Sequence, residues 1–242
     1  MSPLLAALVD DAGLFPPSWL PMDQALARHR ASSHPVLSGR FLGPGDRVGE
    51  LLDHLGADEA LEVHLVGDEA VPLPDDPRIT VRAVELRSGV MGEIPCYVEG
   101  VAPSELAARG VFGKVRCGGV RIPAVEEVAA YVSECTRLGL PFKATAGMHA
   151  AVRGWESTKD QPHHGYLNLL LAVARALTGG DAAAVLASTD ADALAAEALS
   201  LDDEQARAVR GLLHSYGSCD TARPVADAVR LGLVPAPVGS GA

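Results

Sequence analysis

The stretches VFGKVRCGG (residues 111–119) and PFKATAGM (residues 141–148) decide how the rest of the chain is interpreted. Each runs from apolar residues into a lysine, and a glycine follows four positions after that lysine. Short apolar runs of this kind are typical of strands that are buried on both faces of a parallel sheet. We therefore expect two matching strands, each with a lysine at the same place.

These lysines are unusual in their chain. The protein contains only three lysines, Lys114, Lys143 and Lys159, beside seventeen arginines. A lysine amine can lose its proton when it is buried, whereas the guanidinium of arginine stays charged. The pair in the two stretches therefore favours chemistry over packing. The alternative is that both lysines are structural ion-pair partners of buried acids, because perturbed lysines also occur in such networks.

Composition limits the possible partners and compartments. The chain has 242 residues, 48% of them hydrophobic, and a net charge of -11 without a basic cluster. This charge argues against nucleic acid or an anionic membrane surface as a partner. No apolar run is long enough to span a bilayer, and the first residues lack the positive region of a signal peptide, so a cytoplasmic location is expected. The four cysteines have no metal-binding spacing and are expected to be reduced.

Strand-like and helix-like segments alternate along the chain. Eight segments are strand candidates: residues 4–9, 36–42, 61–66, 79–85, 94–99, 111–117, 141–146 and 212–216. Helical patterns lie at 21–33, 46–55, 104–110, 123–139, 166–177, within 181–211 and at 224–231. This alternation predicts a parallel sheet flanked by helices.

The strand count and the length favour one (β/α)8 barrel domain over residues 1–235, followed by a flexible tail at 236–242. The connections around the third to fifth strands are too short for ordinary crossover helices, so an irregular barrel is expected there. Extra helices are expected before the last strand. A doubly wound open sheet is the alternative, although no GxGxxG follows the first strand.

Polar residues gather near the predicted carboxyl ends of the strands, where barrel enzymes carry their reacting groups. They are Asp10, Arg40, Glu85, Glu99, Lys114, Arg116, Lys143, Thr145 and Ser218.

The lysine stretches resemble those of the class I deoxyribose-phosphate aldolases, which form a Schiff base with their substrate. In that family one strand carries Lys-x-x-x-Gly and the next Phe-Lys-x-x-x-Gly, as in residues 114–118 and 142–147 here. Three shorter stretches are similar to other strands of the family, namely residues 9–11, 98–99 and 216–218. Motifs such as AGLFPP, KVRCGG, FKATAG and HGYLNLL resemble those of a bacterial protein family of uncharacterised function.

The resemblance implies that Lys114 is the imine-forming nucleophile. Lys143 would then be the neighbour whose positive charge depresses the pKa of the Lys114 amine. It also implies a phosphate-binding glycine and serine region at Gly217 and Ser218. No cofactor and no metal are expected for this chemistry, which uses a small carbonyl compound as its substrate.

Two departures from the family pattern matter. Where the family has a catalytic aspartate, this chain has His64, so proton transfer is expected from His64, Glu85, Glu99 or Asp10. Where the family has a small hydroxyl residue, this chain has Arg116, which predicts a carboxylate on the substrate.

Further substrate-binding candidates are Thr145 and the glycines at the ends of the last two strands. Gly147, together with Gly217 and Ser218, could hold a phosphate, or the glycines could only permit tight turns. Cys117 and Cys219 could form a two-thiol acid/base pair or fill the core.

Two other classes of function stay open. The first is a metal-dependent hydrolase or isomerase, with ligands from His149, His163, His164 and either Asp10 or Asp11. The second is a non-catalytic protein that binds a small molecule. A homodimer is possible in each case.

Overall fold

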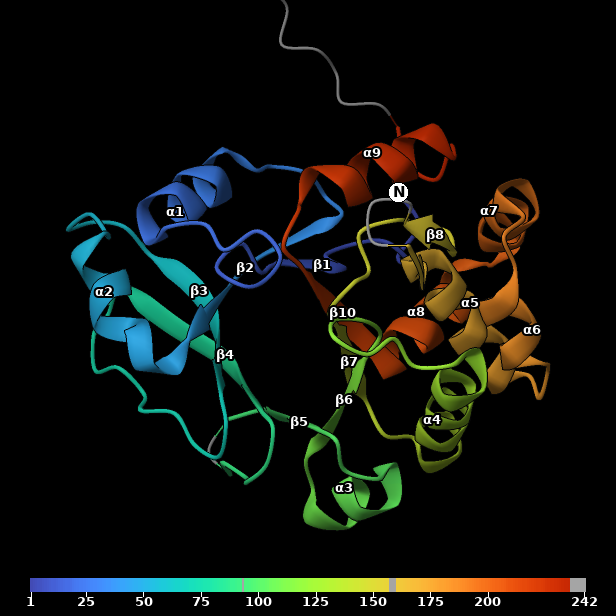
Figure 1. Ribbon diagram of the computed structural model, residues 1–242, viewed down its shortest axis with the longest axis horizontal. Coiled ribbons are helices and arrows are strands. Elements are labelled where there is room, and N and C mark those ends of the chain that lie inside the picture. Colours follow the sequence, from blue (N-terminus) through green and yellow to red (C-terminus); the bar gives the residue numbers. More distant parts are fainter. Residues whose placement is uncertain (93, 157–159, 236–242) are drawn as a thin grey trace, which may run out of the picture.

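The computed structural model describes residues 1–92, 94–156 and 160–235 and confirms the barrel. Eight parallel strands close in the order β1-β10-β7-β6-β5-β4-β3-β2 (Figure 1). Their bounds are β1 Val9–Asp11, β2 Leu37–Pro44, β3 Leu61–Gly67, β4 Ile79–Leu86, β5 Cys96–Glu99, β6 Phe112–Arg116, β7 Phe142–Thr145 and β10 Leu213–Ser218. The predicted (β/α)8 architecture is therefore correct.

Helices cover the outside of the barrel, most densely beside β6, β7 and β10 (Figure 1). They are α1 Met22–Ala31, the 3-10 turn η1 Gly45–Arg47, α2 Val48–Asp53, α3 Pro103–Arg109, α4 Val125–Leu138, α5 Tyr166–Leu177, α6 Ala182–Ala187, α7 Ala191–Ser200, α8 Asp203–Leu212 and α9 Ala222–Arg230. The four helices α5 to α8 lie between β7 and β10, as the Ala-rich sequence predicts. Helices α6, α7 and α8 each begin after an aspartate that accepts a hydrogen bond from the backbone three residues later.

The expected irregularity near the third to fifth strands is present. Strands β3, β4 and β5 are neighbours, and the described residues of their connections form no helix. Parallel neighbours normally need a helical crossover to return the chain to its starting end. Here long loops make the return, and the loop after β3 contributes Asp68 and Val71 to the cavity described below.

The first strand is shorter than the sequence predicts. The apolar run 4–9 suggested a strand, but residues 3–7 form turns and only Val9–Asp11 pairs in the barrel. Leu4, Leu5 and Leu8 are nevertheless buried. Arg210 explains this conformation. Its guanidinium donates hydrogen bonds to the carbonyl oxygens of Leu4 and Ala6, so these backbone groups are satisfied although they do not pair with a neighbouring strand.

An antiparallel hairpin of β8 Gly154–Glu156 and β9 Gln161–His163 lies in the segment after β7. The sequence suggested a loop here, since each strand has only three residues and neither alternates.

The tail 236–242 and Lys159 lie outside the described residues. Within the described part of the chain, no helix has the length and apolar character needed to cross a membrane.

Candidate active site

The centre of the site is the amine of Lys143, which is fully buried inside the barrel. Its Nζ lies 2.6 Å from Oδ2 of Asp10 and 3.0 Å from Nδ1 of His64, and it donates to Oε1 of Glu85. Strands β7, β1, β3 and β4 supply these four side chains. Lys143 therefore joins three other strands across the barrel interior.

Asp10 is fixed by further donors. Arg40 Nε lies 2.8 Å from Oδ1, the Ser38 hydroxyl 2.6 Å from Oδ1, and the Ser215 hydroxyl 2.7 Å from Oδ2. Burial by itself would raise the pKa of Asp10, but the charges of Lys143 and Arg40 outweigh it and hold the pKa below its ordinary value. Asp10 is thus an ionised carboxylate that balances buried positive charge.

The same balance sets the other charges. Burial favours the neutral forms of Glu85 and Lys143, but their mutual attraction prevails, so the pKa of Glu85 is lowered and that of Lys143 is raised. Burial and the charge of Lys143 together lower the pKa of His64. At neutral pH the centre is therefore an ammonium between two carboxylates, with a neutral imidazole beside it.

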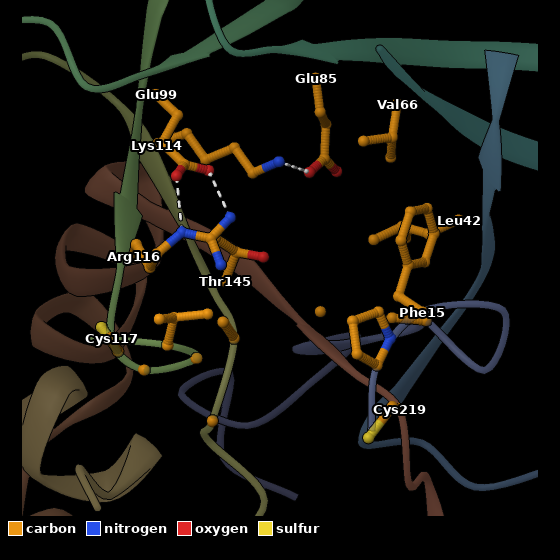
Figure 2. A pocket seen from close by; sticks show the side chains of 18 of the residues that line it. Phe15, Leu42, Val66, Glu85, Glu99, Lys114, Arg116, Cys117, Thr145 and Cys219 are labelled. Atoms are coloured by element: carbon orange, nitrogen blue, oxygen red, sulfur yellow. Dashed lines mark hydrogen bonds and ion pairs between the residues drawn. The ribbon is translucent and has the colours of Figure 1, made fainter. Parts of the chain in front are cut away.

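Both lysines are buried, but Lys114, at 7% exposed, keeps some access to solvent, whereas Lys143 has none. Their Cα positions are register partners on β6 and β7, yet Lys114 lines a cavity and Lys143 is not among the described lining residues. Nζ of Lys114 lies 3.0 Å from Oε2 of Glu85, whose other oxygen binds Lys143 (Figure 2). Glu85 therefore stands between the two amines, and its charge opposes the repulsion that two adjacent ammonium groups would have.

The cavity opens at the carboxyl ends of the strands and has a volume of about 1700 Å³. Glu85, Glu99 and Lys114 reach it from β4, β5 and β6, as expected for a barrel of this type. The sequence prediction placed Asp10 at this rim and named His64 as a possible proton carrier. The structure buries both below it, in contact with Lys143, so they act on the cavity only through other residues.

Arg116 was expected to bind a substrate carboxylate, but it already holds one. Its Nε lies 2.6 Å from Oε1 of Glu99 and its Nη2 lies 3.2 Å from Oε2, and both residues line the cavity (Figure 2). This two-bond geometry is the one that a carboxylate substrate would use. A substrate carboxylate would have to displace Glu99, so Arg116 no longer argues for such a substrate.

Of the remaining predicted substrate-binding residues, three line the cavity and one does not. Thr145, Gly147 and Gly217 line the cavity, whereas Ser218 is buried and donates its hydroxyl to the carbonyl of Asp220. Gly147 has a φ of +74°, and a Cβ there would lie 3.1 Å from the Cα of Gly118. The contact between the loops after β6 and β7 thus explains both glycines that follow the lysines.

The backbone donors at the start of α9, the helix that follows Gly217 and Ser218, already have a partner. The side chain of Asp220 accepts hydrogen bonds from the backbone N–H groups of Ala222 and Arg223, at 2.9 and 3.2 Å. These are donors that a phosphate at this helix end would use.

The histidines proposed as metal ligands do not come together. His163 contacts the carbonyl of Val152, His164 that of Pro123, and His149 the hydroxyl of Ser218. Among the described residues, the group with ligand-like spacing is Asp10, His64 and Glu85, with one ligand atom of each within 4.8 Å of the others. Lys143 Nζ lies among these three side chains, so a bound cation would compete with this ammonium.

The two-thiol pair is also not formed. Cys117 and Cys219 lie on opposite sides of the cavity in Figure 2. Burial raises the pKa of Cys117 to about 12, which keeps it a thiol. Cys219 contacts His149 instead, with Sγ 3.5 Å from Nε2.

Two parts of the site were not predicted from the sequence. Glu85 was one of four possible proton carriers, and nothing in its strand indicated that it would touch both lysines. Tyr97 lies under the site, with the Lys143 amine 5.6 Å from its ring centre and its hydroxyl 2.7 Å from Nδ1 of His214. Alternation on β5 could have placed Tyr97 in the barrel, since it lies two residues before Glu99.

Comparison of the chain with protein-family models, with curated proteins and with solved structures finds no match. A functional conclusion therefore depends on the geometry of the site.

Proposed function

We propose that this protein is a class I aldolase-like lyase in which Lys114 forms an imine with a small carbonyl substrate. The observation that carries the proposal is the different placement of two register-paired lysines: Lys114 lines the cavity, while Lys143 is a buried ammonium. One amine can meet a substrate, and the other can only supply charge.

The first step is addition of the neutral Lys114 amine to the substrate carbonyl carbon. Attack requires that Nζ of Lys114 give up a proton, and Oε2 of Glu85, 3.0 Å away in an ion pair and otherwise without a hydrogen-bond partner, can accept it. Because the pKa of Glu85 is low, the proton stays on this carboxylate only transiently. Return of a proton to the carbinolamine oxygen lets water leave and produces the iminium ion.

The iminium ion then serves as the electron sink. The bond between the carbon next to the iminium carbon and the following carbon breaks, and its electron pair moves toward the nitrogen to give an enamine. The departing fragment gives its hydroxyl proton to Glu85 and leaves as a second carbonyl compound. Protonation of the enamine carbon and hydrolysis by water return the free Lys114 amine. The reverse sequence forms the carbon–carbon bond.

Lys143 and its partners support these steps without touching the substrate. The ammonium of Lys143 holds Glu85 in place and keeps it ionised, so that Glu85 is available to the Lys114 amine. Asp10 balances the charge of Lys143, and Arg40 balances that of Asp10. Lys143, Asp10 and His64 are positioning residues in this mechanism.

Borohydride trapping tests the proposal. Incubation with an aldehyde and borohydride should add one reduced adduct to the wild-type protein, measured as intact mass. The adduct should be lost in Lys114→Met and kept in Lys159→Met. If wild type and Lys114→Met gain the same mass, the imine is not formed at this site, and a non-catalytic binding role becomes the better explanation.

A further inference from the structure

The cavity beyond Lys114 is larger than a small carbonyl compound requires. Its volume is about 1700 Å³, whereas small-molecule sites generally measure about 300–1,000 Å³. A two- or three-carbon carbonyl bound at Lys114 would fill only a small part of it. The remaining space can hold a substituent that extends away from the amine.

The wall across the cavity from Lys114 includes an apolar patch. Figure 2 shows Val66, Leu42 and Phe15 on the side opposite to Lys114 and Arg116. These side chains come from β3, β2 and the loop after β1. A substituent that reaches them gains by removing apolar surface from water, and a charged substituent would lose its hydration there.

The mouth carries an aromatic side chain in an uncommon conformation. Trp19 lines the cavity, its φ is +44°, and 68% of its surface is exposed. A bulky residue in the left-handed region is rare, and such residues concentrate at binding sites. Hydrogen bonds from Trp19 N to Phe15 O, at 3.2 Å, and from Leu20 N to Gly13 O, at 3.0 Å, hold the loop in this shape.

The charges in the cavity do not favour an anion. Its described lining contains six acidic and four basic side chains. Each lining arginine faces a lining acid: Arg87 lies 3.3 Å from Asp68, Arg116 lies 2.6 Å from Glu99, and Arg223 lies 3.9 Å from Glu156. An anionic substituent would meet a net negative surface whose cations are already paired.

We infer that the substrate of this site is an aldehyde or ketone with an uncharged apolar substituent, which extends from the Lys114 imine toward Phe15 and Trp19. The inference rests on the proposed function for the position of the carbonyl. It replaces the carboxylate or phosphate group that Arg116 and the glycines suggested from sequence.

Three aldehydes that share the group CH2–CH2–CHO test the inference. Propanal, 3-phenylpropanal and 4-oxobutanoate differ only in carrying no substituent, an apolar one or an anionic one. Each is titrated at neutral pH with cyanoborohydride present, which reduces the iminium ion in preference to the free aldehyde, and modification of Lys114 is read by peptide mass spectrometry. Half-maximal modification should need at least about tenfold less 3-phenylpropanal than propanal, which corresponds to about 1.4 kcal/mol. The concentration of 4-oxobutanoate needed for half-maximal modification should be at least as high as that of propanal.

A matched pair of variants identifies the surface that gives the preference. Trp19→Ala should reduce the preference for 3-phenylpropanal severalfold. Trp155→Ala should leave it unchanged, because Trp155 is exposed to a similar degree, at 61%, but is not among the described lining residues. Equal effects of the two variants would contradict the assigned position of the substituent.

A binding measurement separates this inference from the imine mechanism. The chain has two tryptophans, so Trp155→Phe leaves Trp19 as the tryptophan reporter. Its fluorescence should change saturably with 3-phenylpropan-1-ol, which cannot form an imine, and not with 4-hydroxybutanoate. A saturable response to the anion alone, or to neither alcohol, overturns the inference.

If Lys114 is modified best by 4-oxobutanoate, the imine proposal stands and the apolar substituent is wrong. If none of the aldehydes modifies Lys114, the imine proposal fails, and the fluorescence titration then decides whether the cavity prefers an apolar substituent.

Discussion

Lys114 and Lys143 are direct register partners on neighbouring strands, and Glu85 lies between their amines. Its Oε2 contacts Lys114, and its Oε1 contacts Lys143. The two lysines are therefore not an isolated pair of like charges. They belong to a chain of alternating charges that runs from Lys114 through Glu85, Lys143 and Asp10 to Arg40. The stability and the reactivity of the site depend on different members of this chain.

Replacement of Lys143 by methionine should destabilise the fold strongly. It leaves Asp10 and Glu85, both at least 99% buried, without their shared cation. Loss of one partner from a buried ion pair costs about 3–5 kcal/mol. Lys114→Met should cost clearly less, since Glu85 keeps Lys143. Urea denaturation of both variants measures the difference. Equal losses would show that the two lysines share the same structural role.

Glu85→Gln should slow adduct formation at Lys114 by a factor of about 10²–10⁴, the usual contribution of a positioned proton acceptor. Glu99→Gln is the control, because Glu99 also lines the cavity but pairs with Arg116. Its effect on the rate should be less than about tenfold. The rate of borohydride-trapped product checks both variants under single-turnover conditions. A larger effect of Glu99→Gln would move the proton carrier to that residue.

The fold should lose stability in acid through Asp10 and Glu85. Their pKa values are lowered in the folded state from 3.8 and 4.5, so the unfolded chain takes up protons first as the pH falls. Their contribution is fully present above about pH 5 and decreases progressively below that pH. The free energy of unfolding of Asp10→Asn should be lower at pH 7 and should fall less steeply between pH 5 and pH 3. An unchanged acid slope would contradict the assigned ionisation of Asp10.

Removal of the ammonium should create a cation site. In Lys143→Ala the carboxylates of Asp10 and Glu85 and the imidazole of His64 keep ligand-like spacing, and the competing charge is gone. Zn²⁺ or Co²⁺ should raise the melting temperature of this variant, because a cation at 100 times its Kd adds about 2.7 kcal/mol of stability. Lys114→Ala keeps the ammonium of Lys143 and should not respond. An equal response of both variants would place the cation elsewhere.

The sequence predicted the barrel, its eight strands and the positions of the two lysines, because buried parallel strands and amphipathic helices leave clear patterns. It did not predict which groups meet inside the barrel. Asp10 and Lys143 are 133 residues apart, and the pairing of Lys143 with Glu85 depends on how the strands are staggered on closure. Local patterns do not encode that stagger.

The partner of Arg116 was not predicted from the sequence either. The residue type of Arg116 suggested a carboxylate on the substrate, but its partner in the structure is Glu99 on the neighbouring strand. The β8–β9 hairpin and the short first strand were also not predicted. Backbone pairing holds the hairpin, and the Arg210 side chain holds the residues before β1, and neither leaves an alternating pattern in the sequence. In contrast, α5 was predicted with its observed bounds, since its apolar run ends clearly at a glycine pair.

The most direct test is the distribution of a reduced adduct among the lysines of the intact wild-type protein. The protein is incubated with 3-phenylpropanal and cyanoborohydride at neutral pH, digested, and quantified by peptide mass spectrometry. The adduct should accumulate on Lys114 in a saturable manner, while Lys143 stays unmodified because it is buried and charged. Modification of Lys143, or of Lys159 alone, would contradict Lys114 as the imine-forming residue.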